Sequence, residues 1–217
     1  MHRARQHAET RTRERRTRLA HEAARLMAEG GIRDFHQAKR KAAERLGIHD
    51  DASLPRNREI EDALREYQRL FLGGRQLQDL RLRREAALRA MEFLARFEPR
   101  LVGPVLEGTA DARSPVSMQL FSDDADAVAR FLDEAGIPAE ARSRRLRLDR
   151  LREGEFPLWV FSAEDLGFEL TVLPIVALRQ APLSNLDEKP MRRASASQLR
   201  QLLVDEDILA YDAGSGD

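Results

Sequence analysis

The residues of this chain whose types and spacing could do chemistry begin at Gly108-Thr109, a small-residue turn that follows an apolar run. The segment 116–121, VSMQLF, comes soon after it. Its alternation puts Val116 and Met118 on one face and Ser117 on the other, which predicts a half-buried strand. Two strands joined through a small-residue turn, directly after a long helix, form a layout that could hold a nucleotide.

Helices are expected to dominate the first 97 residues, because apolar side chains recur there at spacings of three and four. Gly30-Gly31, Gly47 and Gly73-Gly74 separate the periodic segments as helix breakers. The predicted helices cover residues 19–29, 33–46, 55–71 and 76–97.

Strands are expected after Pro99. Alternating or continuous apolar runs predict these strands. The turn at 164–167 predicts that the strands on either side of it, at 158–162 and 168–173, form a hairpin. The fold class is therefore α+β, with a helical N-terminal region followed by a small mixed or antiparallel sheet with flanking helices. The predicted domains are a basic helical region at 1–75, an α+β domain at 76–204 and a loose acidic tail at 205–217. Strands are expected at 101–106, 116–121, 140–149, 158–162 and 168–173, and further helices at 125–135 and 195–204.

The composition of the chain excludes several classes of protein. The chain has 217 residues and no cysteine, which excludes disulfides and thiolate chemistry and agrees with a reducing compartment. Neither a signal peptide nor a membrane-spanning run is expected, so the prediction is a cytoplasmic protein without a membrane partner. The net charge of zero hides a split, since residues 1–97 carry 23 basic and 15 acidic residues (+8) and residues 98–217 carry 14 and 22 (−8).

Such a split often reflects contact with nucleic acid, or docking of one half of the chain against the other or against a partner, here an acidic protein. The candidate phosphate contacts lie in the basic N-terminal segments, where counterion release would make binding depend on salt. The alternative is that these side chains form a solvated helix surface. The candidates are Arg11, Arg13, Arg15, Arg16, Arg18, Lys39, Arg40 and Lys41.

The order of elements from the long helix to the hairpin, over about residues 78–175, resembles the nucleotidyltransferase (polymerase-β-like) superfamily. In that family a Gly-Ser turn holds the nucleotide phosphates, two carboxylates alternate on the next strand, and a third lies on a later strand. Together the carboxylates bind two Mg²⁺ ions. The resemblance makes Gly108-Thr109 the phosphate turn and Glu169 the third carboxylate.

The paired carboxylates of the family would fall near Pro115 and Ser117, and both are missing. Asp111, Asp123 and Asp124 are close in sequence and could substitute, although Asp123 suits a helix N-cap better. The N-terminal segments AEGGIRDFHQAKRKAAERLGI and LPRNREIEDALREYQRLF also resemble a proteobacterial family without an assigned activity.

The resemblance implies a catalytically degenerate protein that binds a nucleotide or an RNA end, with Mg²⁺ as the cofactor if any transfer remains. Gly108, Thr109 and Ser117 would contact the nucleotide, Glu169 would bind a metal or a hydroxyl, and Arg145 and Arg147 would neutralise phosphate charge. The alternative is a non-enzymatic adaptor that binds RNA or an acidic protein through its basic helices. Serine-hydrolase, P-loop and dinucleotide-binding motifs are absent from the sequence.

Overall fold

The computed structural model describes residues 2–214 apart from positions 33, 49, 72, 125, 150, 151 and 185–188. The chain forms two compact units, Met1–Gln76 and Leu77–Asp217, which we name the helical unit and the sheet unit. Helices come first and a five-stranded mixed sheet follows, so the predicted α+β class is confirmed. No helix within the described part of the chain is long and apolar enough to cross a membrane.

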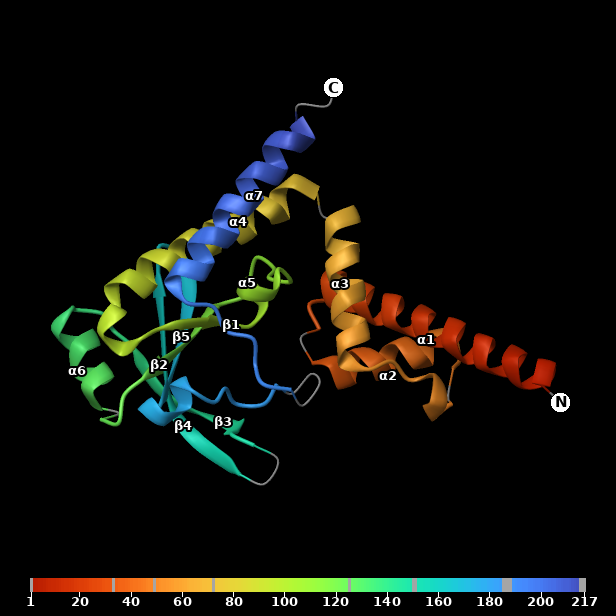
Figure 1. The fold of residues 1–217 in the computed structure, drawn as a ribbon, viewed down its shortest axis with the longest axis horizontal. Coiled ribbons are helices and arrows are strands. Elements are labelled where there is room, and N and C mark those ends of the chain that lie inside the picture. The colour runs from red at the N-terminus through yellow and green to blue at the C-terminus, as the bar shows by residue number, and fades with distance from the viewer. Residues whose placement is uncertain are drawn as a thin grey trace. The chain divides into compact units, whose positions relative to one another are not determined.

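Three helices build the helical unit, namely α1 (His2–Gly30), α2 (Phe35–Leu46) and α3 (Asn57–Phe71), with a short 3₁₀ turn η1 (Asp51–Ser53) between the last two (Figure 1). Asp34 caps α2, because its side chain accepts a hydrogen bond of 2.7 Å from the amide of Gln37. Small side chains let the helices approach closely. The core consists of Leu19, Ala20, Ala23, Ala24, Ala38, Ala42, Ile60, Ala63 and Leu64.

The sheet unit begins with the long helix α4 (Gly73–Phe93), which starts shortly before the unit's boundary, and the 3₁₀ turn η2 (Ala95–Phe97). Its strands are β1 (Arg100–Val102), β2 (Val116–Phe121), β3 (Glu140–Arg147), β4 (Glu153–Ala163) and β5 (Leu166–Leu173). The remaining elements are α5 (Pro104–Glu107), α6 (Asp126–Glu134), the 3₁₀ turn η3 (Ile175–Leu178) and α7 (Ala196–Gly214).

The strand order across the sheet is β1-β2-β5-β4-β3. β2 and β5 pair in parallel, and every other neighbouring pair is antiparallel. The predicted hairpin is present as β4 and β5, joined at a turn where Glu164 and Asp165 both have positive φ. Leu101 and Ala194 exchange two backbone hydrogen bonds, so the segment before α7 extends the sheet beyond β1.

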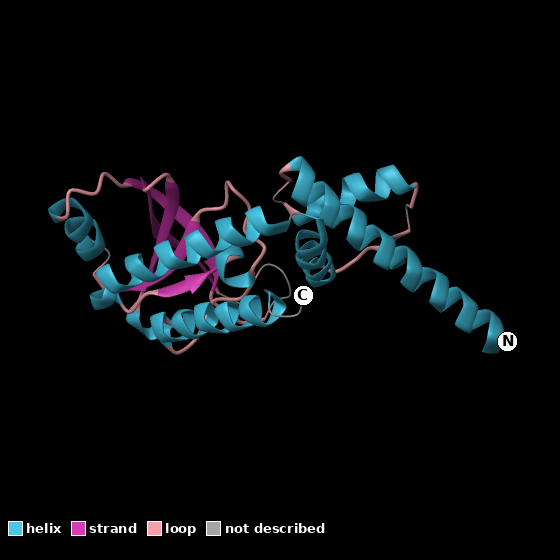
Figure 2. Ribbon diagram, turned by 90° about the horizontal axis from the view of Figure 1, so that it is seen from above, coloured by secondary structure: helices cyan, strands magenta, loops and turns pink. Residues whose placement is uncertain are grey.

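One face of the sheet, which we call the helix face, packs against α4 and α6. Val116, Met118 and Leu120 of β2 and Leu170 of β5 are completely buried there. α7 lies beside α4, as Figures 1 and 2 show, and the ion pair between Arg200 and Glu92 joins the two helices. Burial of this apolar layer is the main stabilising contribution to the unit.

The opposite face, which we call the far face, is also largely covered. Phe121 and Leu173 pack there against Ala177 of η3, and Arg193 lies over the Phe121 ring. All six residues of β2 are consequently buried, so the expectation of a half-buried strand is wrong. The covering segment follows β5 in sequence, and strand periodicity alone did not indicate it.

Several element boundaries also differ from the prediction. The first helix begins at His2 rather than at 19, α4 begins with the predicted breaker Gly73-Gly74 and ends at Phe93, and β4 is longer than the strand expected at 158–162. The strand expected at 101–106 stops at Val102, because Gly103 has φ +72° and Pro104 suits the first turn of a helix. The tail expected to be loose from 205 continues α7 to Gly214, and residues 215–217 lie outside the described part of the chain. Ion pairs of Arg81 with Asp207 and of Arg84 with Glu206 attach this extension to α4.

Leu170→Ala should lower the free energy of unfolding of the sheet unit by about 3 kcal/mol, because it leaves a cavity in a completely buried layer. The fluorescence of Trp159, the single tryptophan of the chain and the cross-strand partner of Leu170, reports urea unfolding of this unit. Leu82→Ala on α4 is the matched control, since Leu82 is 57% exposed and its truncation should change stability by less than about 0.5 kcal/mol. Equal losses in the two variants would contradict the assigned core.

Candidate functional site

Ser117 and Glu169 lie side by side on the far face. The parallel register of β2 and β5 pairs them directly, although they are 52 residues apart in sequence. The Ser117 hydroxyl donates a hydrogen bond of 3.2 Å to Glu169 Oε2. Ser117 is buried, whereas the Glu169 side chain retains 24% of its surface in contact with solvent. The structure thus brings two of the sequence-predicted site residues together, with the carboxylate partly exposed to solvent.

Arg144 of β3 is the third side chain of this group. Its Nη2 donates to Glu169 Oε2 at 2.5 Å, and its side chain is 32% exposed. Arg142, two residues earlier on the same face, is engaged by Glu140 through hydrogen bonds of 2.9 and 2.8 Å. The pKa of Arg142 is raised chiefly by Glu140, and the charge of Glu169 adds to the effect. Glu169 therefore lies between a hydroxyl donor and a guanidinium donor.

Arg145 and Arg147 lie on the opposite face of β3 from Arg144, because successive strand residues alternate between faces. In the register their cross-strand partners on β4 are Glu155 and Glu153. The structure does not bring these two arginines to Glu169. The sequence analysis did not identify Arg144. The available signal was that the segment 140–147 has arginines at both even and odd positions, so that each face of the strand carries some of them.

Gly108 and Thr109 form the end of α5 rather than a turn beside Ser117. Gly108 has φ +80°, and its amide and that of Thr109 both donate to the carbonyl of Pro104. The glycine that approaches Ser117 is Gly103, where an added Cβ would lie 3.9 Å from Ser117 Cβ. Its φ of +72° with ψ of −158° is a conformation that glycine alone adopts without strain.

Arg84 is a buried arginine next to the Gly108 turn. Its guanidinium donates to the carbonyl oxygens of Val105 at 3.0 Å and Leu106 at 3.2 Å, and it forms an ion pair with Glu206. A Cβ added at Gly108 would lie 3.6 Å from Arg84 Nη2. Burial lowers the pKa of Arg84 to about 10, so the group still carries its charge at neutral pH.

The residues at the site do not fit the Mg²⁺ ions that the resemblance implies. Of the two positions for the alternating carboxylates, Pro115 lies against Gly167 of β5 and Ser117 is a hydroxyl donor to Glu169. The Arg144 cation contacts the same carboxylate oxygen that a metal would need. In the described part of the chain, no three His, Cys, Asp or Glu side chains form a group that could hold a metal ion.

The aspartates considered as substitutes have local structural contacts. Asp111 accepts hydrogen bonds from the Arg113 amide and the Ser114 hydroxyl within its own turn. Asp124, rather than Asp123, accepts the amide hydrogen bond at the start of α6. Asp123 accepts a hydrogen bond from the amide of Ile175.

The basic residues of the helical unit divide into two groups. Arg15 donates to Asp50 at 3.3 Å and Arg16 donates to the carbonyl of Ala52 at 2.6 Å, so both contact the loop around η1. The other candidates except Lys39 are exposed side chains, and Lys39 is half-buried, with its pKa lowered chiefly by burial. The exposed candidates are Arg11, Arg13, Arg18, Arg40 and Lys41.

Two adjacent grooves in the helical unit are lined by these side chains. A groove of about 430 Å³ has His36, Lys39 and Arg40 on its α2 wall. A second, of about 380 Å³, includes Arg15 and Arg18, and Ile48 lines both. Glu44 and Asp51 also line the first groove and Asp50 lines the second, so the basic side chains share these walls with carboxylates. The basic side chains of the two grooves could contact an anionic ligand.

No protein-family model, curated protein or solved structure matches the chain.

Arg84→Met should lower the free energy of unfolding of the sheet unit by about 2–3 kcal/mol, because it removes donors from two buried carbonyls. Amide exchange of Thr109 should become faster in the same variant, since the α5 end loses its support. Hydrogen exchange and urea titration measure the two effects. Arg89→Met, an exposed arginine on the same helix, is the control and should leave both unchanged; a Thr109 amide that stays equally protected in Arg84→Met would contradict the assignment.

Proposed function

We propose that this chain is a nucleotidyltransferase-like protein that binds a nucleotide or an RNA end on the far face without transfer chemistry. The observation that carries the proposal is the convergence of Ser117, Glu169 and Arg144 on one partly exposed spot. The resemblance supports the proposal at this point. In the nucleotidyltransferase superfamily a carboxylate on a later strand belongs to the site, and Glu169 of β5 lies beside Ser117 of β2 here.

The chemistry of the three side chains suits a nucleotide. A carboxylate accepts hydrogen bonds from ribose hydroxyls, and a guanidinium matches the oxygens of a phosphate. Glu169 and Arg144 are 24% and 32% exposed, so both can exchange their mutual contact for a ligand. The loss of a partly exposed ion pair costs little free energy compared with a new charge-assisted contact to phosphate.

Arg144→Ala should weaken binding of a nucleoside triphosphate, or of a short single-stranded RNA, at least about tenfold, since a charge-assisted hydrogen bond is lost. Titration calorimetry of the full chain measures this. Arg145→Ala is the matched control, because the same residue type lies one position along the strand on the opposite face. Equal weakening in both variants would place the ligand elsewhere.

Labelled nucleoside triphosphate with Mg²⁺ provides a second readout for the same variants. No transferred product is expected from the unmodified chain, because the two alternating carboxylates are replaced by Pro115 and Ser117. A transferred product that forms with the unmodified chain and is lost in Glu169→Ala would show that transfer activity has survived. It would overturn the proposal that the protein is catalytically degenerate.

A second candidate function is supported by the cationic grooves of the helical unit. We propose as the alternative that these grooves bind the phosphates of RNA, and that the sheet unit serves as a scaffold. Arg18, Lys39 and Arg40 line these grooves. All three belong to the helical unit.

Lys39→Ala with Arg40→Ala should weaken RNA binding by the full chain and lower the salt slope by about one for each phosphate contact removed. Gel shift across a series of salt concentrations measures both quantities. Arg130→Ala, an exposed arginine of α6 paired with Asp124, is the control and should change neither. A salt slope unaltered by the double substitution would remove this candidate.

A further inference from the structure

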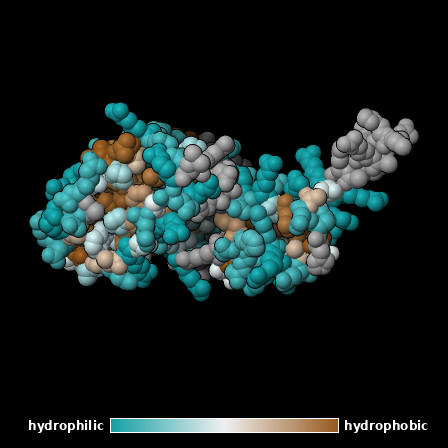
Figure 3. All heavy atoms as spheres, turned by 90° about the horizontal axis from the view of Figure 1, so that it is seen from below, coloured by the Kyte–Doolittle hydropathy of each residue, from teal (hydrophilic) through white to brown (hydrophobic). Residues whose placement is uncertain are grey.

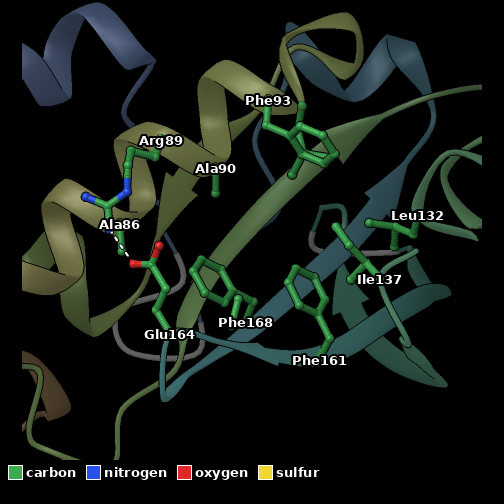
Figure 4. Close-up of a pocket in the computed structure, with 11 residues that line it drawn as sticks. Ala86, Arg89, Ala90, Phe93, Leu132, Ile137, Phe161, Glu164 and Phe168 are labelled. Carbon is green, nitrogen blue, oxygen red and sulfur yellow. Dashed lines mark hydrogen bonds and ion pairs between the residues drawn. The ribbon is translucent and has the colours of Figure 1, made fainter. Parts of the chain in front are cut away.

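A pocket of about 260 Å³ opens on the helix face, away from the Glu169 site (Figure 4). Its shape follows from the side chains that meet there. Ala86 and Ala90, one turn apart on α4, face Phe161 and Phe168 of the hairpin, so small side chains oppose large ones and leave space between them. Leu132 and Ile137 line the pocket beside Phe161.

Two aromatic rings from the hairpin line the pocket. The rings of Phe161 and Phe168 are stacked, with centroids 5.2 Å apart and planes at 7°. Phe93 borders the opening and is 48% exposed, an unusual position for a large apolar ring. Figure 3 shows apolar residues, in brown, at the surface of the sheet unit among the polar ones. Such walls favour an aromatic ligand, which gains by burial and by contact with the two rings.

Size also favours a small aromatic molecule. An apolar cavity of roughly 150 Å³ is enough to hold benzene. The pocket here is larger at about 260 Å³, and it is open to solvent. It therefore has room for a fused ring or for a single ring with a short substituent that reaches the mouth.

The mouth carries one ion pair. Arg89 Nη2 lies 2.7 Å from Glu164 Oε2, and the two side chains are 58% and 71% exposed. An exposed pair of this kind contributes little to stability. Arg89 projects from the middle of α4, and Glu164 lies in the hairpin turn at φ +51°. A planar guanidinium matches a carboxylate in two parallel hydrogen bonds.

We propose that this pocket binds a small planar aromatic carboxylate, with its ring between the α4 alanines and the two stacked phenylalanines. The carboxylate of the ligand replaces Glu164 as the partner of Arg89. Because the pocket and Glu169 lie on opposite faces of the sheet, this site is independent of the function proposed above.

The test is titration of the full, ¹⁵N-labelled chain with 2-naphthoate, the uncharged 2-naphthamide and the cationic 2-naphthylmethylamine. We expect saturable shifts at the amides of residues 86–93 and 161–168, with 2-naphthoate binding the most tightly. Ala90→Leu, which fills the pocket, should weaken 2-naphthoate binding at least about tenfold, because the ring loses its space. Its ¹⁵N spectrum shows whether the fold is retained.

Arg89→Gln separates the ring from the charge and, as an exposed substitution, leaves the pocket walls in place. It should weaken 2-naphthoate about tenfold and leave 2-naphthamide unchanged, since only the acid loses a charge-assisted contact. Arg130→Gln is the control and should affect neither probe. The proposal is overturned if 2-naphthoate shows no saturable binding, if its binding survives Ala90→Leu, or if the amide or the amine binds as tightly as the acid.

Discussion

The parallel pairing of β2 with β5 is the constraint on which the sheet unit depends. Parallel neighbours cannot be joined by a tight turn, so α6, β3 and β4 all lie in the connection between the two strands. The pairing brings Ser117 to Glu169 and, in the same register, stacks Met118 against Leu170 in the core. A shift by one residue would send Glu169 into the apolar layer and expose Leu170, which makes the register strongly determined.

The two faces of this sheet have different chemistry as a result. Over β2 and β5 the helix face is an apolar layer, and the pocket on this face is bordered by aromatic rings and alanines. The far face combines a buried apolar patch near Phe121 and Leu173 with the polar group around Glu169. Alternation along each strand keeps these environments apart, so a change on one face is expected to leave the other intact.

The helical unit follows a simpler physical scheme. Alanines at the contacts between α1 and α2 allow close packing, and the long arginine side chains remain outside or contact the loop around η1. Its basic side chains are displayed mainly on the surfaces of α1 and α2, not in a cavity with buried donors. Electrostatic attraction to phosphate therefore predicts a salt-dependent affinity with little dependence on base sequence.

Local periodicity in the sequence determined most of the elements, since amphipathic helices and alternating strands are encoded within a few residues. The strand 116–121 and the hairpin of β4 and β5 were predictable for this reason, and Gly103-Pro104 already contained the signal that ends β1. Only the tertiary structure decided which arginine of β3 reaches Glu169, and that α5 uses Gly108 as its cap. The contacts of Ser117 and Gln119 on the far face of β2 involve partners more than 50 residues away in sequence, and the contact of Arg144 with Glu169 spans 25 residues, so no local pattern encodes them.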